Sequence, residues 1–254
     1  MVSPFVVTCG RVMTGPLGRA MQLTVRDVAS LLKVSERTIY RWIKEGSIPA
    51  YKISEQYRFH RAEILEWATA RRIGVSVDIF EEADDATARP PVLSEALQAG
   101  GIVYRLGGAD KESALRAAVE SMRLPDEVDR EQLLRVLVAR EAMASTAIGD
   151  GIAIPHVRNP IVLHVPRSMV TLCFLEKPID FGALDGQPVH CLFTMVSPTV
   201  RSHLHLLSRL AFALRDAGFQ GAIRRQGLRD EILTELRRVE TGLNAARPSG
   251  PAGE

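Results

Sequence analysis

The stretch Arg140–His156, REAMASTAIGDGIAIPH, carries the densest chemical pattern in the chain and decides how the C-terminal part is interpreted. Gly149 and Gly151 allow tight backbone turns with bare N–H groups, which suit an anion. Ser145 and Thr146 stand just before them and offer hydroxyl donors. The pattern therefore indicates a phosphate-binding loop, with these two hydroxyls as candidate phosphate ligands.

The loop leads directly to a histidine. Residues 152–154 form a short apolar run, which predicts a strand that delivers Pro155 and His156 to its end. Imidazole titrates near neutral pH, so a histidine can accept and donate a group under cellular conditions. A histidine beside glycine-rich backbone, hydroxyls and an arginine favours nucleophilic phosphoryl transfer, in which nearby donors stabilise the charged oxygens.

Helical and strand-like segments alternate on both sides of this stretch. The helical segments show apolar residues at a spacing of three to four, and the strand segments are short, rich in β-branched residues and bounded by Pro, Gly or Asp. This alternation predicts an α/β domain over residues 92–243, with a mixed sheet flanked by helices. The expected elements are a helix after the cap Asp110, a helix over 128–143, strands over 169–175 and 189–196, and a helix over 202–214.

Three segments together resemble a known family. Residues 140–156, 176–189 (EKPIDFGALDGQPV) and 203–208 (HLHLLS) are similar to the type-2 EIIA domain of the bacterial phosphotransferase system, in its fructose, mannitol and nitrogen-regulatory branches. The resemblance covers about 150 residues. It implies the EIIA fold for the C-terminal part of the chain.

The resemblance also implies roles for individual residues. His156 occupies the place of the phosphorylated histidine, Arg140 would contact the phosphoryl group, and His203 would be the second histidine of the site. The family usually has glycine after the first histidine, whereas this chain has Val157. Because a β-branched residue rarely adopts a positive φ, we expect a loop of different shape, with Arg158 in place of the usual basic residue.

Cysteine and histidine usage excludes several other site classes. Cys9, Cys173 and Cys191 form no C-x-x-C pair, so the chain predicts neither a disulfide scaffold nor a zinc site, and a reducing cytoplasm is the expected compartment. His203 and His205 lack a third ligand at suitable spacing. The sequence thus predicts no metal and no cofactor.

The N-terminal segment, residues 21–73, is of a different kind. Residues 22–72 hold ten Lys and Arg against six Asp and Glu, a local net charge of +4 on a piece with little room for a core. Thr24 with Asp27 predicts a capped first helix, Ser35 caps a second helix and Gly46 ends it. Two short helices joined by such a turn are typical of helix-turn-helix DNA-binding modules.

Here too the residues resemble a family. The runs TVRDVA (24–29), VSERTIYRWI (34–43), IPA (48–50) and YRF (57–59) are similar to the excisionase-type winged helix-turn-helix related to the MerR group. The polar residues of the second helix are expected to contact bases and phosphates. The two strand-like runs after this helix predict a wing. The candidate DNA contacts are Arg37, Thr38 and Arg41 on the helix, with Lys52 and Arg58 near phosphate or minor groove.

The remaining segments carry no fold signal. We expect a disordered leader over 1–20, an acidic linker over 74–91 that ends in Pro90-Pro91, and a disordered tail over 244–254. The overall net charge of +2 is too small to indicate a partner by itself. The longest apolar run is far too short to span a membrane, and no secretory signal is evident.

Together the two modules predict a cytoplasmic regulator. It would accept a phosphoryl group on His156 from a phosphorylated carrier of the HPr or NPr kind, and couple that state to DNA binding or to a regulatory partner. The alternative is an EIIA component that passes phosphate to a separate IIB permease subunit and uses its N-terminal module for protein docking. Either role is that of a phosphohistidine carrier rather than of a free-standing enzyme.

Overall fold

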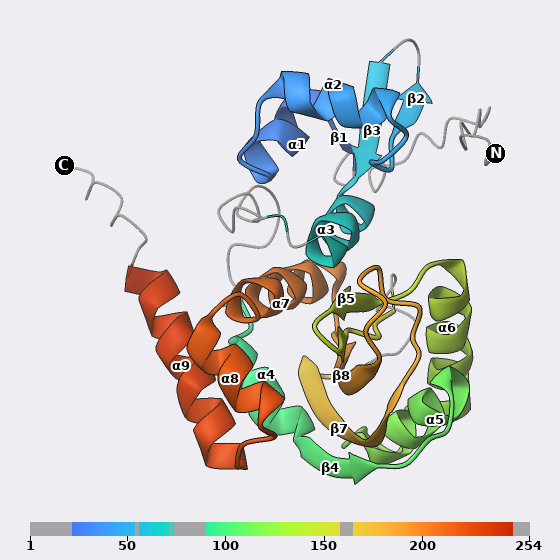
Figure 1. Cartoon of the computed structure of the whole chain (residues 1–254), viewed down its shortest axis with the longest axis vertical. Coiled ribbons are helices and arrows are strands. Elements are labelled where there is room, and N and C mark those ends of the chain that lie inside the picture. Colours follow the sequence, from blue (N-terminus) through green and yellow to red (C-terminus); the bar gives the residue numbers. More distant parts are fainter. Residues whose placement is uncertain (1–21, 54–55, 72, 74–89, 158–164, 246–254) are drawn as a thin grey trace. The chain divides into compact units, whose positions relative to one another are not determined.

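The computed structural model describes residues 22–53, 56–71, 73, 90–157 and 165–245. The expected leader, the expected linker except Pro90 and Pro91, and residues 246–254 of the expected tail lie outside these residues, as does Arg158. Asn244 and Ala245, which were expected in the disordered tail, instead belong to the last helix, Arg229–Ala245. The chain divides into two compact units, residues 1–89 and 90–254 (Figure 1). Each unit is described by itself.

The N-terminal unit is a winged helix-turn-helix. Its two strands after the second helix, β2 and β3, form an antiparallel hairpin, and β1 pairs with β3 on the other edge in the order β1-β3-β2. A closing helix follows. The elements are β1 (Gln22–Leu23), α1 (Val25–Leu31), α2 (Glu36–Lys44), β2 (Tyr51–Ile53), β3 (Gln56–His60) and α3 (Arg61–Ala70).

Capping residues set the helix boundaries of this unit. The Thr24 hydroxyl accepts from the Asp27 N–H while the Asp27 carboxylate accepts from the Thr24 N–H, a reciprocal capping box. Ser35 accepts from the Thr38 N–H at 3.2 Å and so starts α2. Gly46 follows the end of α2 with φ of 63°, a conformation that favours glycine. The caps predicted from the sequence are thus confirmed.

The C-terminal unit is a mixed sheet flanked by helices. Its strand order is β4-β7-β8-β6-β5; β7 pairs parallel to β4 and antiparallel to β8, while β6 pairs parallel to β8. The strands are β4 (Ile102–Leu106), β5 (Ala147–Gly149), β6 (Ile152–Ala153), β7 (Met169–Ile179) and β8 (Val189–Val196). The helices are α4 (Leu93–Gly100), α5 (Lys111–Ser121), α6 (Arg130–Met143), α7 (Val200–Ala213), α8 (Ala217–Arg224) and α9 (Arg229–Ala245).

The helices cover the sheet in two groups. Figure 1 shows α5 and α6 on one side of the sheet, and α4, α7, α8 and α9 on the other. The central strands β7 and β8 are almost entirely buried, which explains why their sequences are nearly continuous apolar runs. The α/β fold predicted from the sequence is therefore confirmed, with strands β7 and β8 and helices α6 and α7 within a few residues of the expected ranges.

Val157 shows how the chain accommodates the residue after His156. Its side chain is 1% exposed and belongs to the core cluster between α5, α6 and the sheet. It is not among the residues with positive φ. Neighbouring residues of an extended segment point to opposite faces of the sheet. The side chain of Val157 therefore points away from that of His156 and adds apolar packing to the core cluster.

Candidate functional site

A left-handed turn joins β5 to β6 and leads to the candidate histidine. Gly149, Asp150 and Gly151 all have positive φ, of 89°, 52° and 71°. At Gly151 an added Cβ would lie 2.1 Å from Nδ1 of His190, so only glycine fits there. The turn reverses the chain so that β6 pairs antiparallel with β5 and parallel with β8, and His156 follows three residues after the end of β6.

His156 is held by a backbone bridge and by one contact of its ring. It forms an isolated parallel bridge with Met195 of β8, and its side chain is 4% exposed. Its Nδ1 lies 2.7 Å from the carbonyl oxygen of Ile154. Because a carbonyl oxygen can only accept, a neutral imidazole at this place carries its proton on Nδ1.

A second histidine faces this ring. His203 lies in the first turn of α7, which Thr199 caps, and its ring centroid is 5.1 Å from that of His156 with an interplanar angle of 31°. The structure thus brings together two histidines that are 47 positions apart in the chain. His205 is 8% exposed and lies on the same helix. Among the described residues no group of three His, Cys, Asp or Glu side chains is arranged to hold a metal.

Arg140 lies in the last turn of α6 and is 7% exposed. Its Nη1 donates to the carbonyl oxygen of Ala144 at 2.7 Å, across the turn that precedes β5. The guanidinium is therefore held beside the segment that the sequence interpretation assigned to phosphate.

The two candidate hydroxyls already have acceptors within the protein. Ser145 Oγ donates to the carbonyl oxygen of Phe181 at 2.6 Å, and Thr146 Oγ1 donates to Oε2 of Glu141 at 2.6 Å. Either hydroxyl would have to exchange that acceptor in order to donate to a phosphoryl oxygen. Glu141 was not singled out from the sequence, although its place next to Arg140 and its burial make it part of the same cluster.

The other titratable groups near the strands are shielded. Burial raises the pKa of the Cys173 thiol to about 11 and also raises the pKa of the Cys191 thiol. Burial lowers the pKa of His190, and the positive charge of Arg224 lowers it further, while Asp150 opposes both. Both cysteines are buried and pack as small hydrophobic residues.

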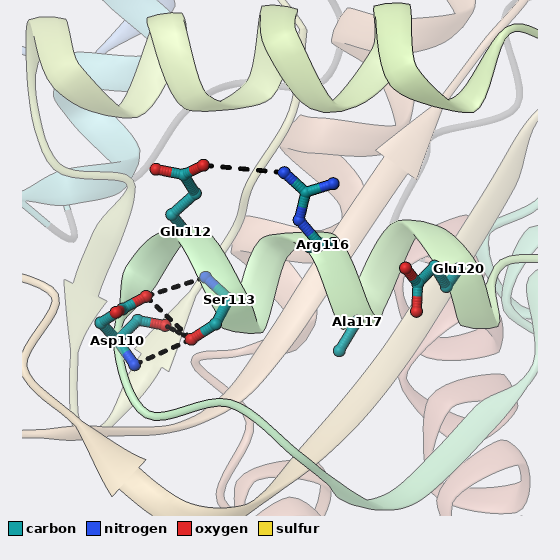
Figure 2. Close-up of a pocket in the computed structure, with 6 residues that line it drawn as sticks. All are labelled: Asp110, Glu112, Ser113, Arg116, Ala117 and Glu120. Carbon is teal, nitrogen blue, oxygen red and sulfur yellow. Dashed lines mark hydrogen bonds and ion pairs between the residues drawn. The ribbon is translucent and has the colours of Figure 1, made fainter.

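A surface depression of about 290 Å³ lies along α5 and contains none of the candidate site residues. Figure 2 shows two sets of contacts there: Asp110 and Ser113 form the cap of α5, and Glu112 pairs with Arg116 at 3.7 Å. The N–H and hydroxyl of Ser113 lower the pKa of the Asp110 carboxyl. This arrangement accounts for the beginning of the helix without any ligand.

The second candidate site is the exposed face of α2. Ile39 is fully buried, whereas Arg37 and Arg41 are exposed one turn apart. Arg41 lies 3.9 Å from Glu45, and the Thr38 hydroxyl lies 3.0 Å from that of Ser35. This face presents two long basic side chains one turn apart on the second helix of the motif, which is the helix that enters the major groove in helix-turn-helix proteins.

The β2–β3 hairpin adds basic residues beside α2. Lys52 is exposed on β2, and Arg58 Nη2 on β3 donates to Gln56 Oε1 at 2.6 Å. Tyr40 of α2 is 51% exposed and meets Tyr57 of β3 edge to face, with ring centroids 6.3 Å apart. Tyr40 was not among the candidate DNA contacts named from the sequence. Its spacing of three residues from Arg37, which places both on the same side of α2, was the available signal.

Two family profiles match the chain, one for each unit. The profile of the family "Phosphoenolpyruvate-dependent sugar phosphotransferase system, EIIA 2" matches residues 95–239, and a "Helix-turn-helix domain" profile matches residues 23–72. The chain therefore belongs to the type-2 EIIA family of the phosphotransferase system and carries a helix-turn-helix domain in front of its EIIA domain.

Its relatives place it within one branch of that family. A "Nitrogen regulatory protein" of Pseudomonas aeruginosa is 36% identical over 143 residues, which are 52% of this chain and 86% of that protein. One from Escherichia coli is 41% identical over 101 residues, 39% of this chain and 58% of the relative. The crystal structure of nitrogen regulatory protein IIA-Ntr from Neisseria meningitidis superimposes with a TM-score of 0.51 at 25% identity, covering 57% of this chain and 99% of that one.

No helix within the described part of the chain combines the length and the apolar character that crossing a membrane would need.

Proposed function

We propose that this protein is a phosphohistidine-carrying regulator in which the EIIA domain accepts a phosphoryl group on His156 and the helix-turn-helix domain binds DNA. The observation that carries the first half is the contact of His156 Nδ1 with the Ile154 carbonyl at 2.7 Å. That contact holds the proton on Nδ1, and it assigns the role of nucleophile to Nε2.

The transfer step follows from this assignment. The lone pair of His156 Nε2 forms a bond to phosphorus while the bond between phosphorus and the imidazole of a phosphorylated HPr- or NPr-like carrier breaks. The proton on Nδ1 stays and continues to donate to Ile154, so the positive charge that develops on the ring of His156 is stabilised there. Arg140 supplies positive charge for the phosphoryl oxygens, and His203 supports the ring from α7.

Ser145, Thr146 and Arg158 complete the proposed phosphate contacts. The two hydroxyls reach phosphate only by exchanging their acceptors on Phe181 and Glu141. Backbone N–H groups of the 149–151 turn are a further source of donors. Buried thiols with raised pKa values suit the reducing cytoplasm in which such a carrier operates.

In this proposal the N-terminal unit carries the output of the signal. Arg37, Thr38 and Arg41 face the major groove in this proposal, and Lys52 and Arg58 contact the backbone or the minor groove. Relatives named as nitrogen regulatory proteins favour a regulatory output over sugar uptake. A single module of this size presents a small interface, so useful affinity calls for a dimer or a partner protein.

Phosphorylation of the full chain by a labelled, phosphorylated carrier protein tests the first half. The native chain is expected to take up label, and His156→Gln is expected to take up none. His190→Gln is the matched control, since His190 lies on the neighbouring strand and has no proposed role. Label that persists at the native level in His156→Gln would contradict the assignment. Onward transfer from His156 to an isolated IIB domain would instead favour the permease-linked role.

A further inference from the structure

One buried carboxylate in the EIIA domain has no part in the mechanism described so far. Glu141 is 7% exposed, and its Oε2 accepts both the backbone N–H of Thr146 at 3.0 Å and the Thr146 hydroxyl at 2.6 Å. Its other oxygen, Oε1, lies 3.8 Å from Nζ of Lys111 in the first turn of α5. Burying a carboxylate is costly unless it is paired and hydrogen-bonded, so such a group has a specific task.

The hydrogen bonds of Glu141 continue toward the reactive histidine. The carbonyl oxygen of Thr146, the residue that Glu141 holds twice, accepts from the N–H of Ile154 at 3.0 Å. The carbonyl oxygen of Ile154 in turn lies 2.7 Å from Nδ1 of His156. Two residues, Thr146 and Ile154, therefore connect the carboxylate of Glu141 to the imidazole of His156 through successive hydrogen bonds.

The same segment is fixed again at its start. Arg140 Nη1 donates to the carbonyl oxygen of Ala144, so two neighbouring side chains at the end of α6 hold the backbone at two neighbouring points of the turn. The strands after this turn are short, since β5 has three residues and β6 has two. So short a hairpin is poorly ordered by its own pairing, and its position depends on the pairing of β6 with β8 on one side and on these side-chain anchors on the other.

We propose that Glu141 is a positioning residue for phosphoryl transfer: by holding Thr146 it fixes the Ile154 carbonyl at the place where that oxygen selects the Nδ1–H tautomer of His156. This inference rests on the proposed function for its kinetic consequence, but its tautomer consequence does not. If the Ile154 oxygen moves away, the proton distributes over both nitrogens, and molecules with the proton on Nε2 have no lone pair there to attack phosphorus.

The direct test is the protonation state of the His156 ring in the full chain, read from ¹⁵N NMR of the imidazole nitrogens. The signals of His156 are assigned by their loss in His156→Gln. The native chain is expected to show the Nδ1–H form, and Glu141→Ala a mixture of the two tautomers. Glu141→Gln is expected to keep the native form, because its single amide oxygen can accept both bonds that now reach Oε2.

Transfer kinetics give the second readout. Glu141→Ala is expected to lower kcat for uptake of the phosphoryl group by about tenfold to a hundredfold with little change in KM for the carrier, since misplacement of a reacting group by an ångström costs that much. Glu141→Gln is expected to stay within about threefold of the native rate. Glu240→Ala is the matched control: Glu240 is also buried and accepts from Leu93 and Ser94 N–H at 2.8 and 3.1 Å, but it holds α4 rather than the hairpin.

The outcomes separate the two claims. A native tautomer and native kcat in Glu141→Ala would overturn the inference, and so would an equal loss in Glu240→Ala, which would reduce Glu141 to ordinary fold stability. If Glu141→Ala does not fold, Thr146→Val decides: it removes only the 2.6 Å hydroxyl bond, and an unaltered tautomer there overturns the inference. If the native chain takes no phosphoryl group, the proposed function fails while the tautomer test still stands.

Discussion

The two units place their candidate functional side chains in opposite environments. In the helix-turn-helix unit Arg37, Arg41 and Lys52 are exposed, whereas His156 and His203 of the EIIA domain are 4% and 1% exposed. The exposed set comes from one helix and the next strand, while the buried pair comes from distant parts of the chain. A substitution at one of the exposed basic residues should change DNA binding and leave the fold intact. A substitution at one of the two buried histidines should change both phosphoryl transfer and the stability of the fold.

The largest expected effect is on stability and compares two glycines with similar φ. At Gly151, with φ of 71°, an added Cβ would meet the His190 ring at 2.1 Å, whereas at Gly46, with φ of 63°, nothing lies within 4 Å. Gly151→Ala should therefore destabilise the EIIA domain by about 2–5 kcal/mol, from strain plus overpacking. Gly46→Ala should cost only about 1 kcal/mol, from the positive φ alone.

The two units can be followed separately during urea unfolding. Both tryptophans of the chain, Trp42 and Trp67, lie in the helix-turn-helix unit, so fluorescence reports on that unit, whereas the far-UV circular dichroism comes mostly from the larger domain. Equal midpoint shifts for Gly151→Ala and Gly46→Ala would mean that the packing of His190 against the turn is not tight.

The next effect is on transfer rate and concerns the two histidines of α7. His203→Gln removes the ring that lies 5.1 Å from His156 and should slow phosphoryl uptake about tenfold to a hundredfold without removing the acceptor. His205→Gln, at a position of similar burial on the same helix, should leave the rate near native. The measurement is single-turnover labelling. A His203→Gln variant as inactive as His156→Gln would show that the two roles have been confused.

The contrast between the units also explains what the sequence alone could predict. The caps Thr24, Ser35 and Asp110 depend on residues within one helical turn, and they were predicted correctly. Strand β4 was not predicted, because it is a short edge strand whose pairing with β7 shifts register and includes Arg105 at a φ of 56°. Such a strand is specified by its neighbour across the sheet and not by its own alternation.

The candidate sites divide in the same way. His156 could be identified because its loop is continuous in sequence, and the exposed basic face of α2 follows from helical spacing. The packing of His203 against His156 entered only through a family resemblance, and the link from Glu141 through Thr146 to Ile154 was not foreseen at all. Those contacts depend on how α6, β5 and β6 fold together, which no local pattern encodes.

A smaller effect is expected for single DNA contacts. Arg37→Ala should cost about 1–3 kcal/mol of binding free energy and relax specificity if the side chain makes a bidentate base contact. Lys52→Ala should instead weaken binding to all sequences. It should also reduce the slope of log K against log salt concentration by about one, because one counterion fewer is released. Arg135→Ala on α6 is the charge-matched control, because it removes an exposed arginine outside the unit. If residues 21–73 within the full chain can be deleted without loss of salt-sensitive duplex binding, the DNA assignment fails.

The smallest expected effect joins the two units. A phosphoryl group adds close to two negative charges at His156, and residues 22–72 carry a net charge of +4. Attraction between them would compete with the phosphates of DNA for the same basic residues, and one or two charge pairs near a surface are worth about 1–2 kcal/mol. Phosphorylated protein should thus bind DNA about five- to thirtyfold more weakly than unphosphorylated protein, and the difference should shrink as salt screens the attraction.

The measurement is duplex binding by both forms at about 50 mM and about 200 mM salt, with His156→Gln treated in the same way as the control. Affinities within about twofold at the lower salt concentration would exclude this competition, because its whole effect depends on unscreened charge, and the phosphorylation state of His156 would then have to act through a partner protein.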